Sequence, residues 1–125
     1  MIKRIVIDLD NTLCYSNGDY INASPNLEVI DKLREYHQLG FEVVIHTSRN
    51  MLTFEGNVGK INVHSLPIIL EWLHKYQVVF DEVVVGKPWC GHDGFYVDDR
   101  AIRPDEFARM SLEEVSKLID AKIAR

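Results

Sequence analysis

The sequence has no long hydrophobic run, few cysteines and no cluster of basic residues, and each absence excludes a class of protein. No apolar stretch approaches the ~20 residues that a membrane-spanning helix needs. The two cysteines, Cys14 and Cys90, are too few for a disulfide framework, so we expect both to be reduced. The net charge is -5, and the scattered Lys and Arg residues argue against nucleic acid as the main partner.

The length and the N-terminal residues restrict the organisation of the chain. With 125 residues there is room for one core, so we expect one domain over 1–125 and no cap domain. Asp8 and Asp10 stand where a secretory signal needs continuous apolar residues. We therefore expect a cytoplasmic protein that does not bind membranes.

Short runs rich in Val and Ile alternate with segments that have helical spacing. The runs KRIVI, EVVI, EVVV and GFYV predict buried strands at 3–7, 42–45, 82–85 and 94–97. Helices are predicted from Ser24 and Pro25 to Gly40, from Ser65 with Pro67 in its first turn, and from the capping box of Ser111 and Glu114. The segments 14–23 and 49–63 are predicted to be loops. This order predicts an α/β fold: a Rossmann-like three-layer α/β/α sandwich with a mostly parallel central sheet.

Polar side chains follow every predicted strand. Because the carboxyl ends of parallel strands share one edge of a sheet, we expect these side chains to converge in one cleft. They are Asp8 and Asp10, then Thr47 and Ser48, then Lys87, then Asp98 and Asp99.

This set of side chains suits the cleavage of a phosphate monoester. Asp8 is the predicted nucleophile, and Asp10, two residues further along an extended chain, is the predicted general acid and base. The hydroxyl of Thr47 and the ammonium of Lys87 are expected to bind the phosphoryl group, with Ser48 as an alternative to Thr47. Lys60 competes with Lys87 but does not follow a strand. Several carboxylates beside a phosphate require a cation, and Mg²⁺, with Asp8 and Asp98 as ligands, fits best.

The same motifs resemble those of the haloacid dehalogenase (HAD) superfamily. DLDNT, IHTSRN, VGKPW and YVDDR are similar to its four motifs and occur in its order. The resemblance implies an aspartyl phosphate on Asp8, acid and base chemistry by Asp10 with its backbone carbonyl on the metal, Asp98 as a metal ligand, and Asp99 acting directly or through water. It also implies a helical turn and a small flap after Asp10. Because no cap domain fits, the protein is identified as a cap-less member.

The substrate and two rival functions stay open. NVGKINVHSLPIILEWL and VGKPWCGHDGFYVDDRAIRP resemble the small phosphatases of bacterial capsule polysaccharide biosynthesis, which implies a phosphorylated sugar as substrate. The rivals are a receiver-like signalling domain, which is expected to carry its phospho-accepting Asp after a middle strand, and a non-catalytic phosphate-binding regulator. Roles for Arg49, Arg100, Tyr15, Tyr20 and Trp89 beside the site are undecided, as is the oligomeric state.

Overall fold

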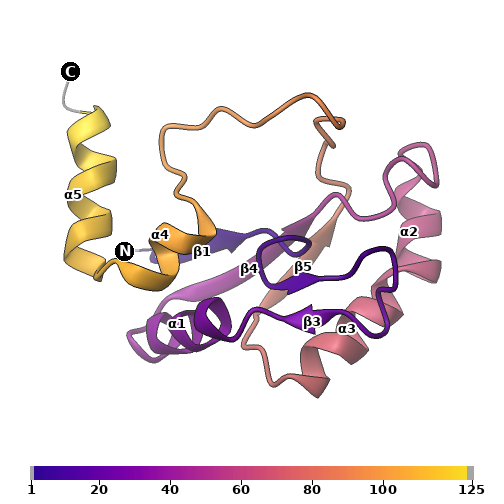
Figure 1. The fold of residues 1–125 in the computed structure, drawn as a ribbon, viewed down its shortest axis with the longest axis horizontal. Helices are drawn as coiled ribbons and strands as arrows, with labels where there is room; N and C mark the ends of the chain where they lie inside the picture. The colour runs from indigo at the N-terminus through magenta and orange to yellow at the C-terminus, as the bar shows by residue number, and fades with distance from the viewer. Residues whose placement is uncertain (1, 124–125) are drawn as a thin grey trace. The chain divides into compact units, whose positions relative to one another are not determined.

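The structure is a computed structural model that describes the backbone of residues 2–123 and the side chains of residues 2–120 (Figure 1). It divides the chain into two units, Met1–Trp89 and Cys90–Arg125. One domain over 1–125 remains a prediction. No helix among the described residues combines the length and the apolar character needed to cross a bilayer.

Three parallel strands form the sheet of the first unit. They are β1 (Arg4–Ile7), β4 (Glu42–Thr47) and β5 (Glu82–Val85), with β4 in the centre (Figure 1). Each forms where the sequence has a Val- and Ile-rich run, and in the central strand β4 the residues on both faces are largely buried. The α/β fold with a parallel sheet is therefore confirmed.

The two faces of this sheet differ in exposure along its edge strands. On one face Ile7 and Ile45 are buried and pair in register, and Val83 continues the row on β5. On the other face Val6 is 61% exposed and Val84 is 40% exposed. One face thus packs against the rest of the core, and the other is open along β1 and β5.

The first helix, α1 (Leu27–Gln38), begins later than the sequence predicts. Its N-cap is Asn26, whose side chain accepts a hydrogen bond from the Val29 backbone N–H, and not Ser24. Ser24–Pro25 instead forms the short strand β3, which pairs antiparallel with β2 (Cys14–Tyr15). Asn26 also donates to the carbonyl of Thr12 at 3.1 Å. It therefore joins the start of the helix to the loop that follows β1.

Two helices follow β4, and only one was predicted. α2 (Val58–His64) replaces the last part of the predicted loop 49–63 and has Asn57 as its N-cap, whose side chain accepts from the Lys60 backbone N–H. Gly59 and the short length hide this helix from periodicity. α3 (Leu66–Lys75) begins at Ser65 and carries a proline in its first turn, as predicted.

The second unit contains α4 (Pro104–Arg109) and α5 (Leu112–Ile123). The predicted capping box of α5 is confirmed: Ser111 and Glu114 exchange bonds of 3.0 and 3.1 Å. α4 was not predicted, and the predicted strand over 94–97 is wrong for this structure, in which the described residues form no strand there. Phe95 is 79% exposed and Val97 is 88% exposed, so the segment lacks the neighbouring strand that it needs.

Candidate active site

Asp8 and Lys87 meet at the carboxyl edge of the sheet. Asp8 directly follows β1, and its Oδ1 lies 3.7 Å from Nζ of Lys87. The backbone N–H of Lys87 donates to the Thr47 carbonyl at 3.1 Å, which extends the ladder between β4 and β5 by one bond. Lys87 is thereby fixed beside the end of β4. Lys60, its rival in sequence, lies on α2 and is exposed.

Glycine at position 86 places this lysine. Gly86 has φ +87°, a conformation that L side chains rarely adopt, and a Cβ there would lie 2.9 Å from a methyl carbon of Val58. The backbone turns sharply out of β5 at this point. Only glycine allows the turn and the close approach of α2 together.

Asp8 carries a charge that its surroundings oppose. Burial raises the pKa of its carboxyl group above 3.8, Lys87 and the Leu9 backbone lower it, and the charge of Asp10 raises it. The net direction is upward, so one lysine does not compensate for the lost solvation. An additional cation at this carboxylate would restore the balance.

His46, which the sequence analysis did not select, belongs to the same electrostatic group. Burial and the charge of Lys87 lower the pKa of its imidazole, while Asp8 raises it. The side chain alternates with Thr47 and so points to the other face of β4. A neutral imidazole near Lys87 adds no positive charge to the site.

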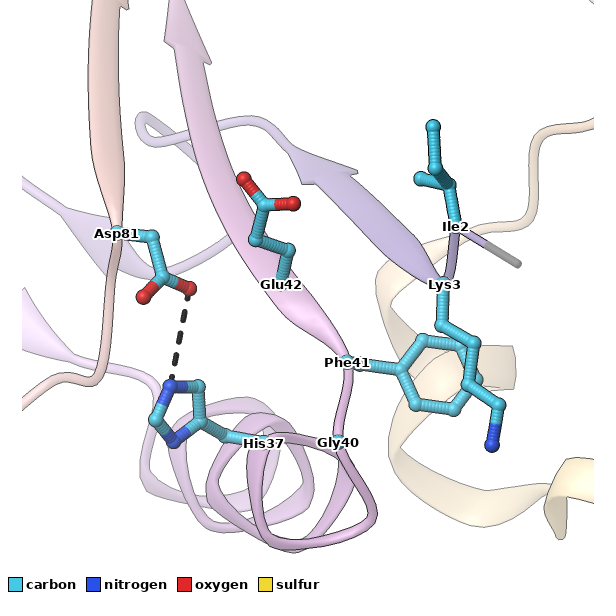
Figure 2. Close-up of a pocket in the computed structure, with 7 residues that line it drawn as sticks. All are labelled: Ile2, Lys3, His37, Gly40, Phe41, Glu42 and Asp81. Atoms are coloured by element: carbon cyan, nitrogen blue, oxygen red, sulfur yellow. Dashed lines mark ion pairs between the residues drawn. The ribbon is translucent and has the colours of Figure 1, made fainter.

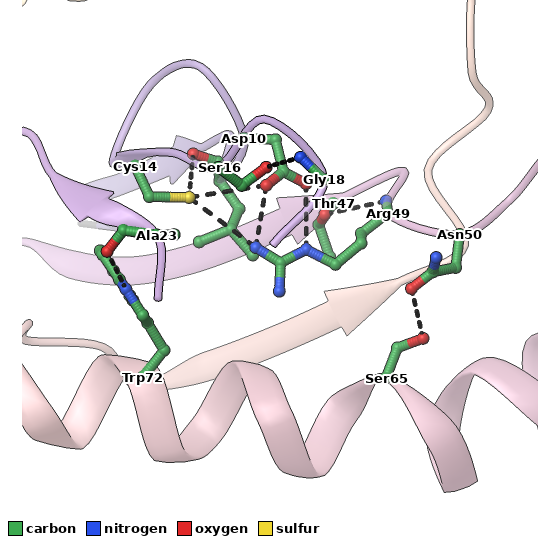
Figure 3. A network of polar contacts seen from close by, with 11 residues as sticks. Asp10, Cys14, Ser16, Gly18, Ala23, Thr47, Arg49, Asn50, Ser65 and Trp72 are labelled. Atoms are coloured by element: carbon green, nitrogen blue, oxygen red, sulfur yellow. Dashed lines mark hydrogen bonds and ion pairs between the residues drawn. The ribbon is translucent and has the colours of Figure 1, made fainter. Parts of the chain in front are cut away.

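Asp10 is held by Arg49. The Arg49 Nε and Nη2 atoms donate to the two carboxylate oxygens of Asp10 at 3.1 and 2.8 Å, a bidentate pair (Figure 3). The Arg49 side chain is only 2% exposed, and its Nη1 has no hydrogen-bond partner among the described residues. The sequence placed Arg49 beside the site but did not predict this pair.

Cys14 and Tyr20 complete the surroundings of Arg49. Nη2 of Arg49 also contacts Sγ of Cys14 at 3.7 Å, and the ring of Tyr20 lies 4.1 Å from the guanidinium carbon. Burial, assisted by the charge of Asp10, raises the pKa of the Cys14 thiol to about 12. This cysteine is an uncharged, buried contact and not a nucleophile.

The loop after Asp10 has the shape that the resemblance implies. The Leu13 N–H donates to the Leu9 carbonyl at 2.8 Å, which closes one helical turn, and Asn11 has a positive φ of 62°. β2 and β3 then form a small flap. Trp72 on α3 holds the flap by donating to the Ala23 carbonyl at 2.9 Å (Figure 3).

Thr47 is buried at the carboxyl end of β4, and Ser48 follows it. Thr47 is 1% exposed, and its Oγ1 accepts a hydrogen bond from the Arg49 backbone N–H at 3.0 Å. Because that bond uses a lone pair, the hydroxyl proton remains available for donation. The Ser48 carbonyl accepts from the Met51 N–H at 3.0 Å, which starts the turn after β4.

Asp98 and Asp99 belong to the second unit. Both are exposed, and Oδ1 of Asp98 accepts from the Arg100 backbone N–H at 2.8 Å, which makes a local turn. They do not follow a strand in this structure. Their role in the site stays a prediction.

The donor chemistry of the first unit fits Mg²⁺ only in part. Among the described residues, no three or more His, Cys, Asp or Glu side chains form a group that could hold a metal ion. The hard carboxylate oxygen of Asp8, which lacks compensating charge, is a suitable ligand. The Asp10 carboxylate is engaged by Arg49, which leaves its backbone carbonyl as the natural donor. Further ligands have to come from outside this cluster.

A pocket lies at the amino ends of the strands (Figure 2). Its lining includes Phe41, His37 and Asp81, and Nε2 of His37 lies 3.7 Å from Oδ2 of Asp81. The Asp81 carboxylate also accepts from the Val43 N–H at 2.8 Å. These groups stand at the amino end of β4, away from the carboxyl edge where parallel sheets bind ligands. We assign this pocket no part in the site.

Sequence comparison identifies the family. Residues 5–71 match the sequence profile of the haloacid dehalogenase-like hydrolases. The chain belongs to this family. The hydrolase has no match among the curated proteins that were compared.

Solved structures similar to the hydrolase include one close relative. A structural-genomics target from Vibrio cholerae is 64% identical over 97% of this chain and 99% of its own, with a TM-score of 0.95. Two chains from structures of the Pnkp1/Rnl/Hen1 complex, described in one case as an RNA repair complex, are 23% and 21% identical, each with a TM-score of 0.50. The hydrolase covers only 28% and 40% of their lengths, and they show a shared fold alone.

Proposed function

We propose that the hydrolase is a magnesium-dependent phosphomonoesterase in which Asp8 forms an aspartyl phosphate. The observation that carries this proposal is the pair of Asp8 and Lys87, 3.7 Å apart, beyond the ends of β1 and β5, which flank β4 and its Thr47. A nucleophilic carboxylate, an ammonium and a hydroxyl donor are the groups that phosphoryl transfer needs. Bound Mg²⁺ would neutralise phosphoryl charge and align the phosphate with Asp8.

The proposed reaction has two steps. A carboxylate oxygen of Asp8 attacks phosphorus, the bond from phosphorus to the leaving oxygen breaks, and Asp10 donates a proton to that oxygen. Water then attacks the phosphorus of the aspartyl phosphate, Asp10 accepts its proton, and inorganic phosphate leaves. Thr47 and Lys87 bind the equatorial oxygens throughout, with Ser48 as the alternative donor.

Asp10 must partly leave Arg49 to act in this way. Both of its oxygens accept bonds from Arg49, so an oxygen that carries the transferable proton has to give one bond up. A phosphate bound nearby offers Arg49 a new acceptor, and its Nη1 already has no partner among the described residues. Substrate binding would thereby release the acid.

For the metal, we propose Asp8, the Asp10 carbonyl and Asp98 as ligands, with Asp99 acting directly or through water. Asp98 and Asp99 supply the carboxylates that the first unit lacks. The chemistry of these donors is that of a hard-cation site.

We further propose a small phosphorylated substrate, such as a sugar phosphate of polysaccharide biosynthesis, in the cytoplasm. The support is the resemblance to capsule polysaccharide phosphatases and the absence of a cap domain between β1 and β5 in the described chain. The receiver alternative is disfavoured because Asp8 follows the first strand of the chain, whereas a receiver is expected to carry its phospho-accepting Asp after a middle strand. Measured turnover of a phosphate monoester would exclude the non-catalytic alternative.

Hydrolysis of p-nitrophenyl phosphate tests the proposal. We expect Mg²⁺-dependent release of nitrophenol, lost with EDTA and reduced at least ~10³-fold in Asp8→Asn and in Asp10→Asn. Asp31→Asn, on the surface of α1, is the control and should keep wild-type rates. Full turnover by Asp8→Asn would remove the nucleophile, and full turnover by Asp10→Asn would require another proton donor. A screen of phosphorylated sugars, nucleotides and peptides then identifies the substrate.

A further inference from the structure

Two parts of the described chain could each pair with a strand but do not: the outer edge of β1 and the segment Gly94–Val97. Among the described residues, β1 forms its ladder with β4 alone, so its outer edge presents backbone donors and acceptors. The segment Gly94–Val97 has the composition of a strand but forms no ladder, and its Phe95 and Val97 are 79% and 88% exposed. An exposed edge and an exposed strand-like segment are complementary.

We propose that Gly94–Val97 of a second copy of this chain pairs with β1 as a fourth parallel strand. The exchange is reciprocal and makes a dimer with two equivalent sites. This inference rests on the proposed function: each site combines Asp8 of one copy with Asp98 and Asp99 of the other. The second copy thereby supplies the carboxylates that the first unit lacks.

The outer edge of β1 suits this strand better than that of β5. A parallel strand with Val97 beside Ile7 places Asp98 level with Asp8, and Phe95 beside Ile5 on the buried face of the sheet. On β5 the same segment would lie next to Lys87, two strands away from β1. Val6 on β1 is also more exposed than Val84 on β5, at 61% against 40%.

The connector is too short for the same pairing within one chain. From the end of β5, the chain would have to cross three strand spacings and about five residues along the strands, roughly 22 Å in a straight line. A path over the sheet is longer, because it has to clear the side chains of β4. Parallel crossovers accordingly need about a dozen residues or more. Here residues 86–93 are all that separate β5 from the segment.

Local structure shortens this connector further. A Cβ on Gly94 would overlap the carbonyl oxygen of Cys90, so the chain folds back on itself between these two residues. Gly86 and Gly91 have positive φ angles of 87° and 82°, which turn the backbone at both ends. Residues 86–90 can then span at most about 18 Å, and the folded-back residues 91–94 add only a few ångströms, so the connector falls short of a path over the sheet. Pairing with another copy carries no such limit.

Complementation between inactive variants tests the exchange. Asp8→Asn and Asp98→Asn chains, with different affinity tags, are co-produced and the mixed species is purified and assayed with p-nitrophenyl phosphate and Mg²⁺. In an exchanged dimer one of the two sites has both aspartates, so the purified mixed species should show about half of wild-type activity per chain. Activity no higher than that of the separate variants, with an active wild type, would overturn the exchange.

Disulfide trapping gives a readout that does not depend on activity. In a Cys90→Ser background, Val6→Cys and Tyr96→Cys chains are co-produced and oxidised, and a cross-linked heterodimer is expected on a non-reducing gel. Val84→Cys with Tyr96→Cys is the matched control and should not cross-link. An internal cross-link in the double variant Val6→Cys/Tyr96→Cys, running as a single chain of 14.4 kDa, would overturn the proposal. If wild type lacks phosphatase activity but the heterodimer forms, the function fails and the exchange stands.

Discussion

Asp8 combines a nucleophile's position with an unfavourable electrostatic environment. Burial raises the pKa of its carboxyl group more than Lys87 lowers it. Asp10, two residues away, has its charge compensated by a bidentate arginine. The two carboxylates of one motif therefore differ in what surrounds them, which is how paired acids acquire separate roles.

The buried charge of Asp8 predicts how stability depends on pH. Because its pKa in the folded state is raised, the stability associated with Asp8 is fully present below 3.8 and is lost as the pH rises through the folded-state value. In EDTA, Asp8→Asn should therefore be more stable than wild type at pH 7, and the gap should close near pH 3. Urea unfolding across this range measures it.

Asp19 provides a control of opposite sign. Hydrogen bonds from Asn22 lower the pKa of its carboxyl group, so its contribution is present above 3.8 and is lost as the pH falls. Asp19→Asn should lose stability at pH 7. If Asp8→Asn also lost stability there, the attraction of Lys87 would outweigh the burial of Asp8.

The two cysteines should differ sharply in reactivity. Cys14 is fully buried, and the pKa of its thiol is raised to about 12, whereas Cys90 is partly exposed. With a thiol reagent at pH 8, folded wild type should therefore react at Cys90 alone, and Cys90→Ser should react only after urea is added. Rapid labelling of folded Cys90→Ser would contradict the burial of Cys14.

The turn after β5 shows how elements place a functional side chain. Lys87 lies within reach of Asp8 because the chain leaves β5 at Gly86 with a positive φ, directly against Val58 of α2. The end of β5, Gly86 and α2 together position Lys87, and sequence periodicity did not reveal α2. Asn26 has a similar joint role, since it caps α1 and donates to the loop after β1.

Gly86→Ala should damage activity more than stability. The methyl group adds a contact of 2.9 Å to Val58 and strains the backbone, so Lys87 moves and kcat for p-nitrophenyl phosphate should fall at least ~10-fold. Gly40→Ala is the matched control, because Gly40 also has a positive φ, 95°, but nothing within 4 Å. Both variants should lose about 1 kcal/mol of unfolding free energy.

A second substitution separates the contact from the backbone strain. Adding Val58→Ala to Gly86→Ala removes the methyl group that the new Cβ meets, and should restore part of kcat. Equal losses of kcat in Gly40→Ala and Gly86→Ala would instead show that Lys87 is not placed by this turn.

The whole molecule is expected to be a pair of chains. Its sheet has three strands where the sequence motifs supply four, and the fourth motif lies in a unit of its own. An exchange of Gly94–Val97 would complete both the sheet and the set of carboxylates. Stability and catalysis would then depend on the same association.

Thermal stability should accordingly depend on protein concentration. Raising the concentration 100-fold favours the dimer by mass action, and the midpoint should rise by about 4 °C. Phe95→Lys places a charge at a position expected on the buried face of the sheet and should abolish this dependence, whereas Phe95→Leu should keep it. Scanning calorimetry with sedimentation measures both. A midpoint independent of concentration in wild type, with a sedimenting species of one chain, would contradict the dimer.

The sequence by itself determined the parallel strands, the helix that starts at Ser65, the capping box of α5 and the family. These follow from short-range patterns: runs of Val and Ile, cap residues, and polar side chains directly after strands. It also selected Lys87 over Lys60, because the end of a strand fixes where a side chain lies. The chemical roles of these residues remain predictions.

Only the tertiary structure decided the pairing of Asp10 with Arg49, the burial of Cys14 and the start of α1 at Asn26. Each depends on contacts between residues far apart in the chain, or on competition such as that of β3 for Ser24. The segment 94–97 also shows that a local sequence pattern does not specify long-range contacts. Its composition specifies a strand, but a strand exists only where a neighbour accepts its hydrogen bonds, and that neighbour is supplied by tertiary or quaternary structure.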